Sequence, residues 1–152
     1  MVWAAISWYS DGPIVTLQGH VTANDYVTIL GDKVHHIMQT LFPNGDAIYQ
    51  ANNACVHIAH IVQDWFSENE DEVSRLPWPP QSPDINIIKP LWSVLESNLH
   101  ARYPPPSSLT ELANVLQEEW YKIPLQIIQD LYLSIPRRLK AVLQARGCPT
   151  PY

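Results

Sequence analysis

Proline interrupts this chain of 152 residues at fourteen positions, and so limits where helices and strands can run. A proline lacks the backbone N–H that the interior of a helix or a central strand requires. Two clusters, at 77–83 (PWPPQSP) and 104–106 (PPP), predict stiff, extended loops with little chain entropy to lose on folding. The regular elements must therefore be short and lie between these loops.

The hydrophobic pattern between the prolines predicts a mixed α/β fold. Residues 1–7 (MVWAAIS) are an almost continuous apolar run, and a turn signal (SDGP) separates them from residues 14–17, so the two runs predict a β-hairpin. Apolar residues at helical spacing then predict a helix, capped by Thr22 or Asn24, that ends before Pro43. Shorter patterns predict a weak strand at 47–49, a helix at 58–66 and a last strand within 73–78.

The C-terminal third is expected to be helical. Ser82 or Asp84 is expected to cap a helix that follows the first proline cluster. A Ser-Ser pair followed by a glutamate resembles a capping box for a helix over 109–122. A last helical stretch over 124–145 is predicted to be interrupted at Pro136.

Length and composition fit one domain, with sheet and helices over 1–103 and a helical tail over 104–152. A hydrophobic content of 46% against 16% charged residues argues against wholesale disorder. No apolar run approaches the ~20 residues of a membrane span, so no membrane partner is expected. The N-terminus lacks the pattern of a secretory signal. Cys55 and Cys148 make no disulfide framework, so the nucleus or the cytoplasm is the expected location.

Charge is unevenly distributed along the chain. Residues 1–76 hold two basic and nine acidic side chains, net −7, whereas residues 77–152 are close to balance. The last sixteen residues contain four cations and no acid: Arg137, Arg138, Lys140 and Arg146. We expect these four to make at most weak, non-sequence-specific contacts with DNA. The alternative is an ordinary solvated helix face.

Residues 77–92 read PWPPQSPDINIIKPLW, a run that packing alone does not explain. This segment is similar to the third catalytic block of the transposases of the Tc/mariner superfamily, which usually reads WPPQSPDLNPIENLW. In the same order, MVWAAIS with GPIVTLQG resembles the central hairpin, YQANNACVHIA resembles the QQDNAPCHTA block, and residues 123–152 resemble the C-terminal end. The resemblance covers essentially the whole chain. It implies an RNase H-like (DDE) domain whose ancestral activity is DNA transposition by metal-dependent strand cleavage and transfer.

The resemblance also implies a catalytic site in which three carboxylates hold two Mg²⁺ ions. The family's second acid falls on Asn52 and its third on Lys89, and we expect the first acid, with its central strand, to be absent. An amide offers an uncharged oxygen, and an ammonium group cannot ligate Mg²⁺. We therefore expect a catalytically inactive protein that has lost the ancestral Mg²⁺ site and carries no cofactor.

Two other arrangements of polar residues are candidate metal sites. Asp84 could replace a lost acid, but it is expected to cap a helix instead. Glu96 shares a helix face with Lys89 but lies about 10 Å farther along the axis, too far to substitute. His57, His60 and Asp64 have i, i+3, i+7 spacing, which on one helix would suit Zn²⁺, but we expect no stoichiometric zinc.

Three hypotheses on function remain open at this stage. The first is an inactive transposase remnant with residual DNA binding. The second is an interaction module that pairs with itself or with related transposases, and the third is a reading frame with no retained function. Without the central strand, we expect the hairpin of residues 2–17 to pair directly with the strand at 47–51 in a sheet of three to four strands. Unpaired sheet edges would then make the protein marginal or self-associating.

Overall fold

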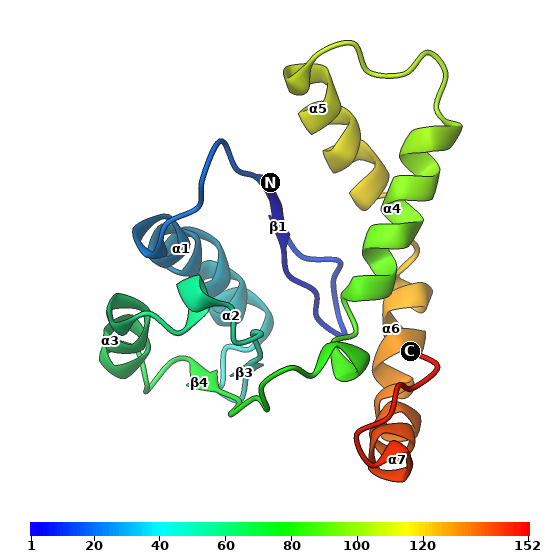
Figure 1. Cartoon of the computed structure of the whole chain (residues 1–152). Coiled ribbons are helices and arrows are strands. Elements are labelled where there is room, and N and C mark those ends of the chain that lie inside the picture. The colour runs from blue at the N-terminus through cyan, green and yellow to red at the C-terminus, as the bar shows by residue number, and fades with distance from the viewer. The chain divides into compact units, whose positions relative to one another are not determined.

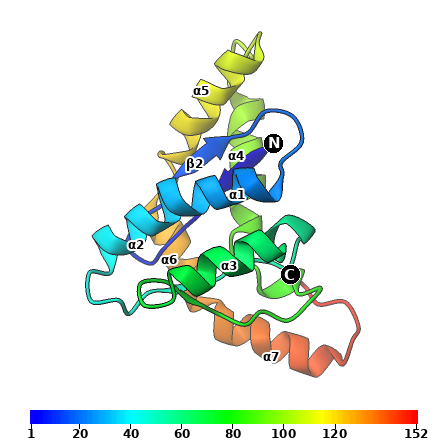
Figure 2. The same cartoon turned by 90° about the vertical axis from the view of Figure 1, so that its left-hand side faces the viewer.

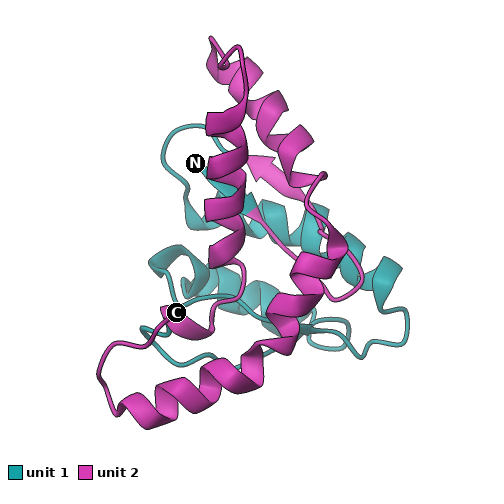
Figure 3. Ribbon diagram, turned by 90° about the vertical axis from the view of Figure 1, so that its right-hand side faces the viewer, with its two compact units in different colours: residues 1–3, 17–82 teal, residues 4–16, 83–152 magenta.

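A computed structural model describes all 152 residues, and Figure 1 follows the chain from β1 to α7. The residues gather into two compact units, coloured separately in Figure 3. Unit 1 comprises Met1–Trp3 and Leu17–Ser82, and unit 2 comprises Ala4–Thr16 and Pro83–Tyr152. The division of one domain at residue 103 stays a prediction.

Unit 1 begins with a long helix made of α1 (Ala23–Ile29), a π-helical turn η1 (Leu30–His35) and α2 (His36–Leu41). Of the two predicted caps, Thr22 is used. Its hydroxyl accepts a hydrogen bond from the Asp25 backbone N–H at 3.2 Å, and the Asp25 carboxylate accepts one from the Thr22 N–H at 2.8 Å. This reciprocal capping box satisfies two backbone donors and fixes where the helix starts.

The π turn explains how this helix keeps one face buried. The side chains that it contributes to the core of unit 1 recur every fourth residue, at Tyr26, Leu30, Val34 and Met38. In an α-helix of 3.6 residues per turn, such a face would rotate by about 40° at each step. A π turn holds more residues per turn and reverses part of that rotation. All four side chains therefore reach the same core.

The remaining elements of unit 1 close over that face. They are β3 (Ile48–Tyr49), the 3-10 turn η2 (Cys55–His57), α3 (His60–Glu68) and β4 (Ser74–Arg75). Strands β3 and β4 are parallel neighbours, and α3 lies beside α1 (Figure 2). Val62 and Phe66 of α3 join the buried residues of the long helix, with Ala47 and Val73 at the strands.

Unit 2 is mainly helical. Its helices are α4 (Lys89–Ala101), α5 (Leu109–Trp120), α6 (Leu125–Leu133) and α7 (Ile135–Ala145). Ser108 caps α5 by accepting from the Glu111 N–H at 3.1 Å, as the sequence predicts. Pro124 precedes α6, and Pro136 separates α6 from α7 by lying in the first turn of α7, where no N–H is needed.

The hairpin of β1 (Val2–Ala4) and β2 (Ile14–Thr16) is confirmed, and its tip belongs to unit 2. Trp120 is fully buried there, and its indole N–H donates to the carbonyls of Asp11 and Gly12, both at 3.1 Å. Gly12 has φ +60°, and a Cβ on it would lie 2.3 Å from the Ala5 carbonyl oxygen. Only glycine fits this tip.

The prediction of one sheet with three to four strands is wrong. The strands form two separate two-stranded sheets, β1 with β2 and β3 with β4. Both β3 and β4 are only two residues long. So short a strand exposes too few backbone groups to recruit a hairpin across a gap of one strand, roughly 4.8 Å.

Two helix boundaries also differ from the predictions. The helix expected at 58–66 begins at His60, because the 3-10 turn η2 occupies the preceding residues. Neither Ser82 nor Asp84 caps α4, because a second 3-10 turn, η3 (Pro83–Ile85), intervenes and no side chain caps the helix. None of the helices has the length and apolar character that crossing a bilayer requires.

Candidate functional site

Asn52 lies in the loop that follows β3, and its polar groups hold that loop together. Its side-chain oxygen accepts a hydrogen bond from the Ala54 backbone N–H at 3.2 Å. Its backbone carbonyl lies 3.1 Å from Nδ1 of His57, which must donate because a carbonyl can only accept. The exposed Asn52 amide therefore acts as a turn-forming group, a common role of asparagine.

His57 is the half-buried support of this loop. Its ring stacks on Tyr26 at 4.2 Å between centroids, and its backbone carbonyl accepts from the Arg75 guanidinium at 3.3 Å. Burial lowers the pKa of His57, outweighing the hydrogen bond to Asn52, which acts in the opposite direction. The imidazole is therefore neutral near pH 7, and its protonation is opposed by burial rather than by the hydrogen bond to Asn52.

We expect the free energy of unfolding to fall as the pH drops below about 6.5, the ordinary pKa of histidine. The unfolded chain takes up a proton near that pH, whereas folded His57, with its lowered pKa, does so only at lower pH. The unfolded state therefore binds more protons in this window and is favoured by acid. Urea denaturation from pH 7.5 to 5 measures the slope.

The matched variants for this test are His57→Gln and His60→Gln. His60 is exposed, so its replacement should leave the pH dependence unchanged, whereas His57→Gln should flatten it. Equal slopes in the two variants would contradict the assignment to His57. Glu72, whose pKa is lowered chiefly by its hydrogen bond to His35, affects stability only below its ordinary value of 4.5.

The proline-rich loop after β4 is tied to the loop after β3. The Asn53 side chain donates to the Trp78 carbonyl at 2.8 Å, and Ser82 donates to the Pro80 carbonyl at 3.2 Å. Because β3 and β4 are parallel, both loops leave the same edge of the sheet. The carboxyl edge of parallel strands is where α/β proteins commonly form their sites.

Lys89 is the first residue of α4 in unit 2, and its side chain is exposed. Pro90 is accommodated in the first turn of the helix, and that turn contains no acidic residue. A cation at the positive end of a helix dipole is unfavourable, whereas a carboxylate there would be stabilised. The start of α4 thus suits the acid of the family motif better than the lysine that it carries.

The other two candidate acids, Asp84 and Glu96, lie on either side of Lys89 in the sequence. Asp84 contributes its backbone carbonyl, which accepts from the Arg138 guanidinium at 2.8 Å. Glu96 lies in the same helix as Lys89 and is exposed. No contact links either carboxylate to the Lys89 ammonium.

The three residues weighed as a zinc site do not share one helix. His57 belongs to the separate turn η2, while His60 and Asp64 lie on α3. The predicted i, i+3, i+7 arrangement on one helix is therefore wrong, because α3 begins only at His60 and His57 lies before it. The structure contains no group of three or more His, Cys, Asp or Glu side chains arranged to hold a metal ion.

The four basic residues of the C-terminal region have unequal surroundings. Arg137, Lys140 and Arg146 are exposed, whereas Arg138 is only 6% exposed. Arg138 donates to the Ser134 hydroxyl and to the Asp84 carbonyl, both at 2.8 Å. It therefore joins α7 to the turn before α4, a structural role that the count of charges does not reveal.

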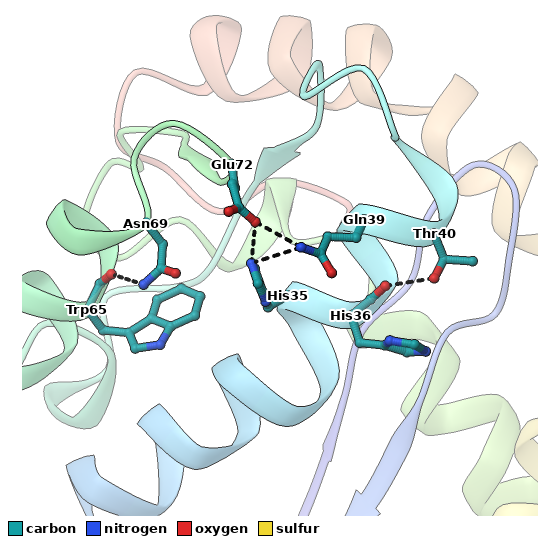
Figure 4. A network of polar contacts seen from close by, with 7 residues as sticks. All are labelled: His35, His36, Gln39, Thr40, Trp65, Asn69 and Glu72. Atoms are coloured by element: carbon teal, nitrogen blue, oxygen red, sulfur yellow. Dashed lines mark hydrogen bonds and ion pairs between the residues drawn. The ribbon is translucent and has the colours of Figure 1, made fainter.

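A polar network on unit 1 has no counterpart in the sequence predictions (Figure 4). The His35 imidazole lies 2.5 Å from a Glu72 carboxylate oxygen, which also accepts from Gln39 at 3.0 Å. His36 points away from this pair, as expected for adjacent helical residues (Figure 4). The network tethers the acidic turn before β4 to the π turn. Its partners are 37 residues apart in sequence, so no local pattern could have indicated it.

A family model described as DDE superfamily endonuclease matches residues 2–111, which include both strand-edge loops and Lys89. The chain belongs to this family. It is homologous to transposases of the Tc1/mariner type. It is 33% identical over its 152 residues to the Tcb1 transposase of Caenorhabditis briggsae and 32% identical to the Tc1 transposase of Caenorhabditis elegans. The chain covers 54% of each, so it spans about half the length of these relatives.

Solved structures of the Mos1 mariner transposase resemble this DDE domain. The catalytic domain of Mos1, solved with raltegravir and manganese, matches with a TM-score of 0.74 over 90% of this chain and 69% of that one. A Mos1 paired-end complex with manganese also gives 0.74, over 91% of this chain and 40% of that one. Sequence identity is 18% in both cases, so the likeness concerns the fold. The RNase H-like fold class predicted from sequence is confirmed.

Proposed function

We propose that this DDE domain no longer cleaves or joins DNA and that it retains weak, non-sequence-specific DNA binding. The observation that carries the proposal is the pair of side chains at the positions of the second and third acids of the family motif. These are Asn52, engaged in its own loop, and Lys89, a cation at the start of α4. The ancestral activity of such a domain is DNA transposition.

The donor set present does not fit the Mg²⁺ ions that the family motif implies. Mg²⁺ prefers charged oxygen ligands in a strict octahedral arrangement. The Asn52 oxygen carries no charge and already accepts a hydrogen bond from Ala54. The Lys89 ammonium offers no lone pair and repels a divalent cation. We therefore propose that the domain works without a metal cofactor.

The exposed cations of α7 support the DNA-binding half of the proposal. Arg137 and Lys140 lie on α7, and Arg146 follows its last residue. Contacts between lysine or arginine and phosphates weaken with salt, with a slope of about −0.9 in log–log form for each phosphate neutralised. The relatives are named as transposases and Mos1 has been seen in a paired-end complex, so DNA and related transposases are the partners proposed.

The test combines a cleavage assay with a binding assay on the purified chain. With Mg²⁺ or Mn²⁺, we expect no nicking of supercoiled DNA above the level without protein, because Asn52 and Lys89 supply no charged ligand. Fluorescence anisotropy with a labelled duplex should show weak binding that salt abolishes. Metal-dependent nicking that disappears in Asp84→Ala would overturn the proposal and indicate a rearranged site.

A second candidate function, self-association, is favoured by exposed apolar side chains on α7. Leu139, Val142 and Leu143 are 44%, 37% and 79% exposed. Burying such side chains between two chains is favourable and hardly depends on salt. Size-exclusion chromatography at low and high salt separates the two functions, because association that salt does not weaken, without DNA binding, supports the second. A monomer that binds no DNA supports neither.

A further inference from the structure

Tyr152 contacts two of the basic residues of α7 at once. Its hydroxyl oxygen accepts a hydrogen bond from Nε of Arg137 at 2.9 Å. Its ring lies under the Arg138 guanidinium, with the guanidinium carbon 4.5 Å from the ring centroid. The segment after α7 therefore folds back so that one tyrosine contacts both guanidinium groups, Arg138 with its ring and Arg137 with its hydroxyl.

Neither guanidinium is neutralised by a carboxylate. The ion pairs of the structure involve His35, Arg102 and Lys122, and the first turn of α7 has no acidic residue. The acceptors around the two arginines are uncharged oxygens, namely the Tyr152 and Ser134 hydroxyls and the Asp84 carbonyl. Two uncompensated cations in the first turn of a helix, where the dipole is also positive, favour an anion.

We infer that Arg137 and Arg138 form a binding site for a phosphate group of the DNA backbone and that Tyr152 occupies this site in the unbound chain. Arginine binds phosphate oxygens through its planar set of N–H donors. The phenol oxygen holds the place of one phosphate oxygen on Arg137, and the ring shields the face of Arg138. The inference rests on the proposed DNA binding, and it explains why one of the predicted contact residues is buried.

Displacement of Tyr152 requires little rearrangement of the fold. Tyr152 is 38% exposed and follows the last helix, so the ring can leave without disturbing a core. Arg138 keeps its hydrogen bonds to Ser134 and Asp84, which hold its guanidinium in place. A preoriented guanidinium loses less side-chain entropy on binding an anion. The site thus consists of a fixed arginine, an exposed arginine and a removable cover.

The decisive variant is Tyr152→Ala, tested in the full chain. Uncovering the site should add at least one phosphate contact to DNA binding. Each added contact steepens the salt slope by about 0.9, which is an extra loss of affinity of about 3.5-fold between 50 and 200 mM salt. Tyr152→Phe keeps the ring but removes the acceptor for Arg137, so an intermediate effect is expected. Tyr121→Ala, at an exposed tyrosine, is the matched control.

A direct readout separates the anion site from DNA binding. The Nε–H signals of Arg137 and Arg138 in ¹H–¹⁵N spectra should shift on titration with inorganic phosphate, at lower concentration in Tyr152→Ala than in the unmodified chain. Phosphate-induced shifts without DNA binding would support the site and refute the proposed function. If phosphate moves neither signal in Tyr152→Ala, or if the unmodified chain and the variant bind DNA with the same salt slope, the inference is wrong.

Discussion

Replacement of Trp120 by alanine should lower the free energy of unfolding by about 3–5 kcal/mol, the usual range for a buried tryptophan. Trp120 is fully buried, and its ring stacks on Trp92 with 5.6 Å between centroids. Its indole N–H also joins α5 to the hairpin tip through the carbonyls of Asp11 and Gly12. The alanine variant loses the packing and both hydrogen bonds together, and urea denaturation measures the sum.

Two further variants separate these contributions. Trp120→Phe retains an aromatic ring but leaves the two carbonyls without the indole donor, so a smaller loss is expected, about 1–3 kcal/mol. Tyr121→Ala changes the neighbouring aromatic residue, which is 58% exposed, and should stay within about 0.5 kcal/mol of the unmodified chain. A Trp120→Ala variant as stable as Tyr121→Ala would show that the hairpin tip does not depend on this residue.

Local signals in the sequence predicted the elements whose ends depend on neighbouring residues. Thr22 with Asp25 and Ser108 with Glu111 form the caps that start α1 and α5, because a cap needs only a side chain and a backbone N–H three residues away. The hairpin was predicted from two apolar runs, residues 1–7 and 14–17, that a turn containing a glycine separates. These features depend on a few adjacent residues and are visible in the sequence.

The sheet could not be predicted in the same way, because strand pairing joins distant residues. Ile48 pairs with Ser74 and Tyr49 with Arg75, in strands too short to carry an alternating pattern. The prediction of a larger sheet assumed that the hairpin of residues 2–17 would pair directly with the strand at 47–51. The start of α4 was misplaced for a related reason, since the Asp84 carbonyl of the turn η3 accepts a hydrogen bond from Arg138 of α7, 54 residues away in sequence.

The candidate site was located by resemblance, but its surroundings were not. The family motif led to Asn52 and Lys89, whereas nothing local indicated that His57 would stack on Tyr26 and support the Asn52 loop. The sequence indicates the burial of Arg138 only weakly. Ser134 lies four residues before Arg138 and therefore on the same helix face, where its hydroxyl can accept a hydrogen bond from the guanidinium. A count of basic residues cannot distinguish such an arginine from an exposed one.

Tyr26 is the residue of unit 1 whose loss should matter most for the candidate site. Its side chain is 1% exposed, its hydroxyl lies 3.0 Å from the Tyr49 hydroxyl, and its ring carries the His57 imidazole. Tyr26→Ala should lower the free energy of unfolding by about 3–5 kcal/mol, as other buried aromatic truncations do. The loss combines a cavity in the core with a Tyr49 hydroxyl that no longer has its partner.

The same variant tests whether the core of unit 1 and the Asn52 loop are coupled. Without the Tyr26 ring, His57 becomes more exposed, so the desolvation that lowers its pKa should weaken and the loss of stability below pH 6.5 should shrink. Thr28→Ala, at an exposed position of α1, should leave both stability and its pH dependence nearly unchanged. If Tyr26→Ala is strongly destabilised but keeps the full pH dependence, burial against Tyr26 is not what holds His57 neutral. The Asn52 loop would then depend on other contacts of His57, its hydrogen bond to Asn52 and its carbonyl on Arg75.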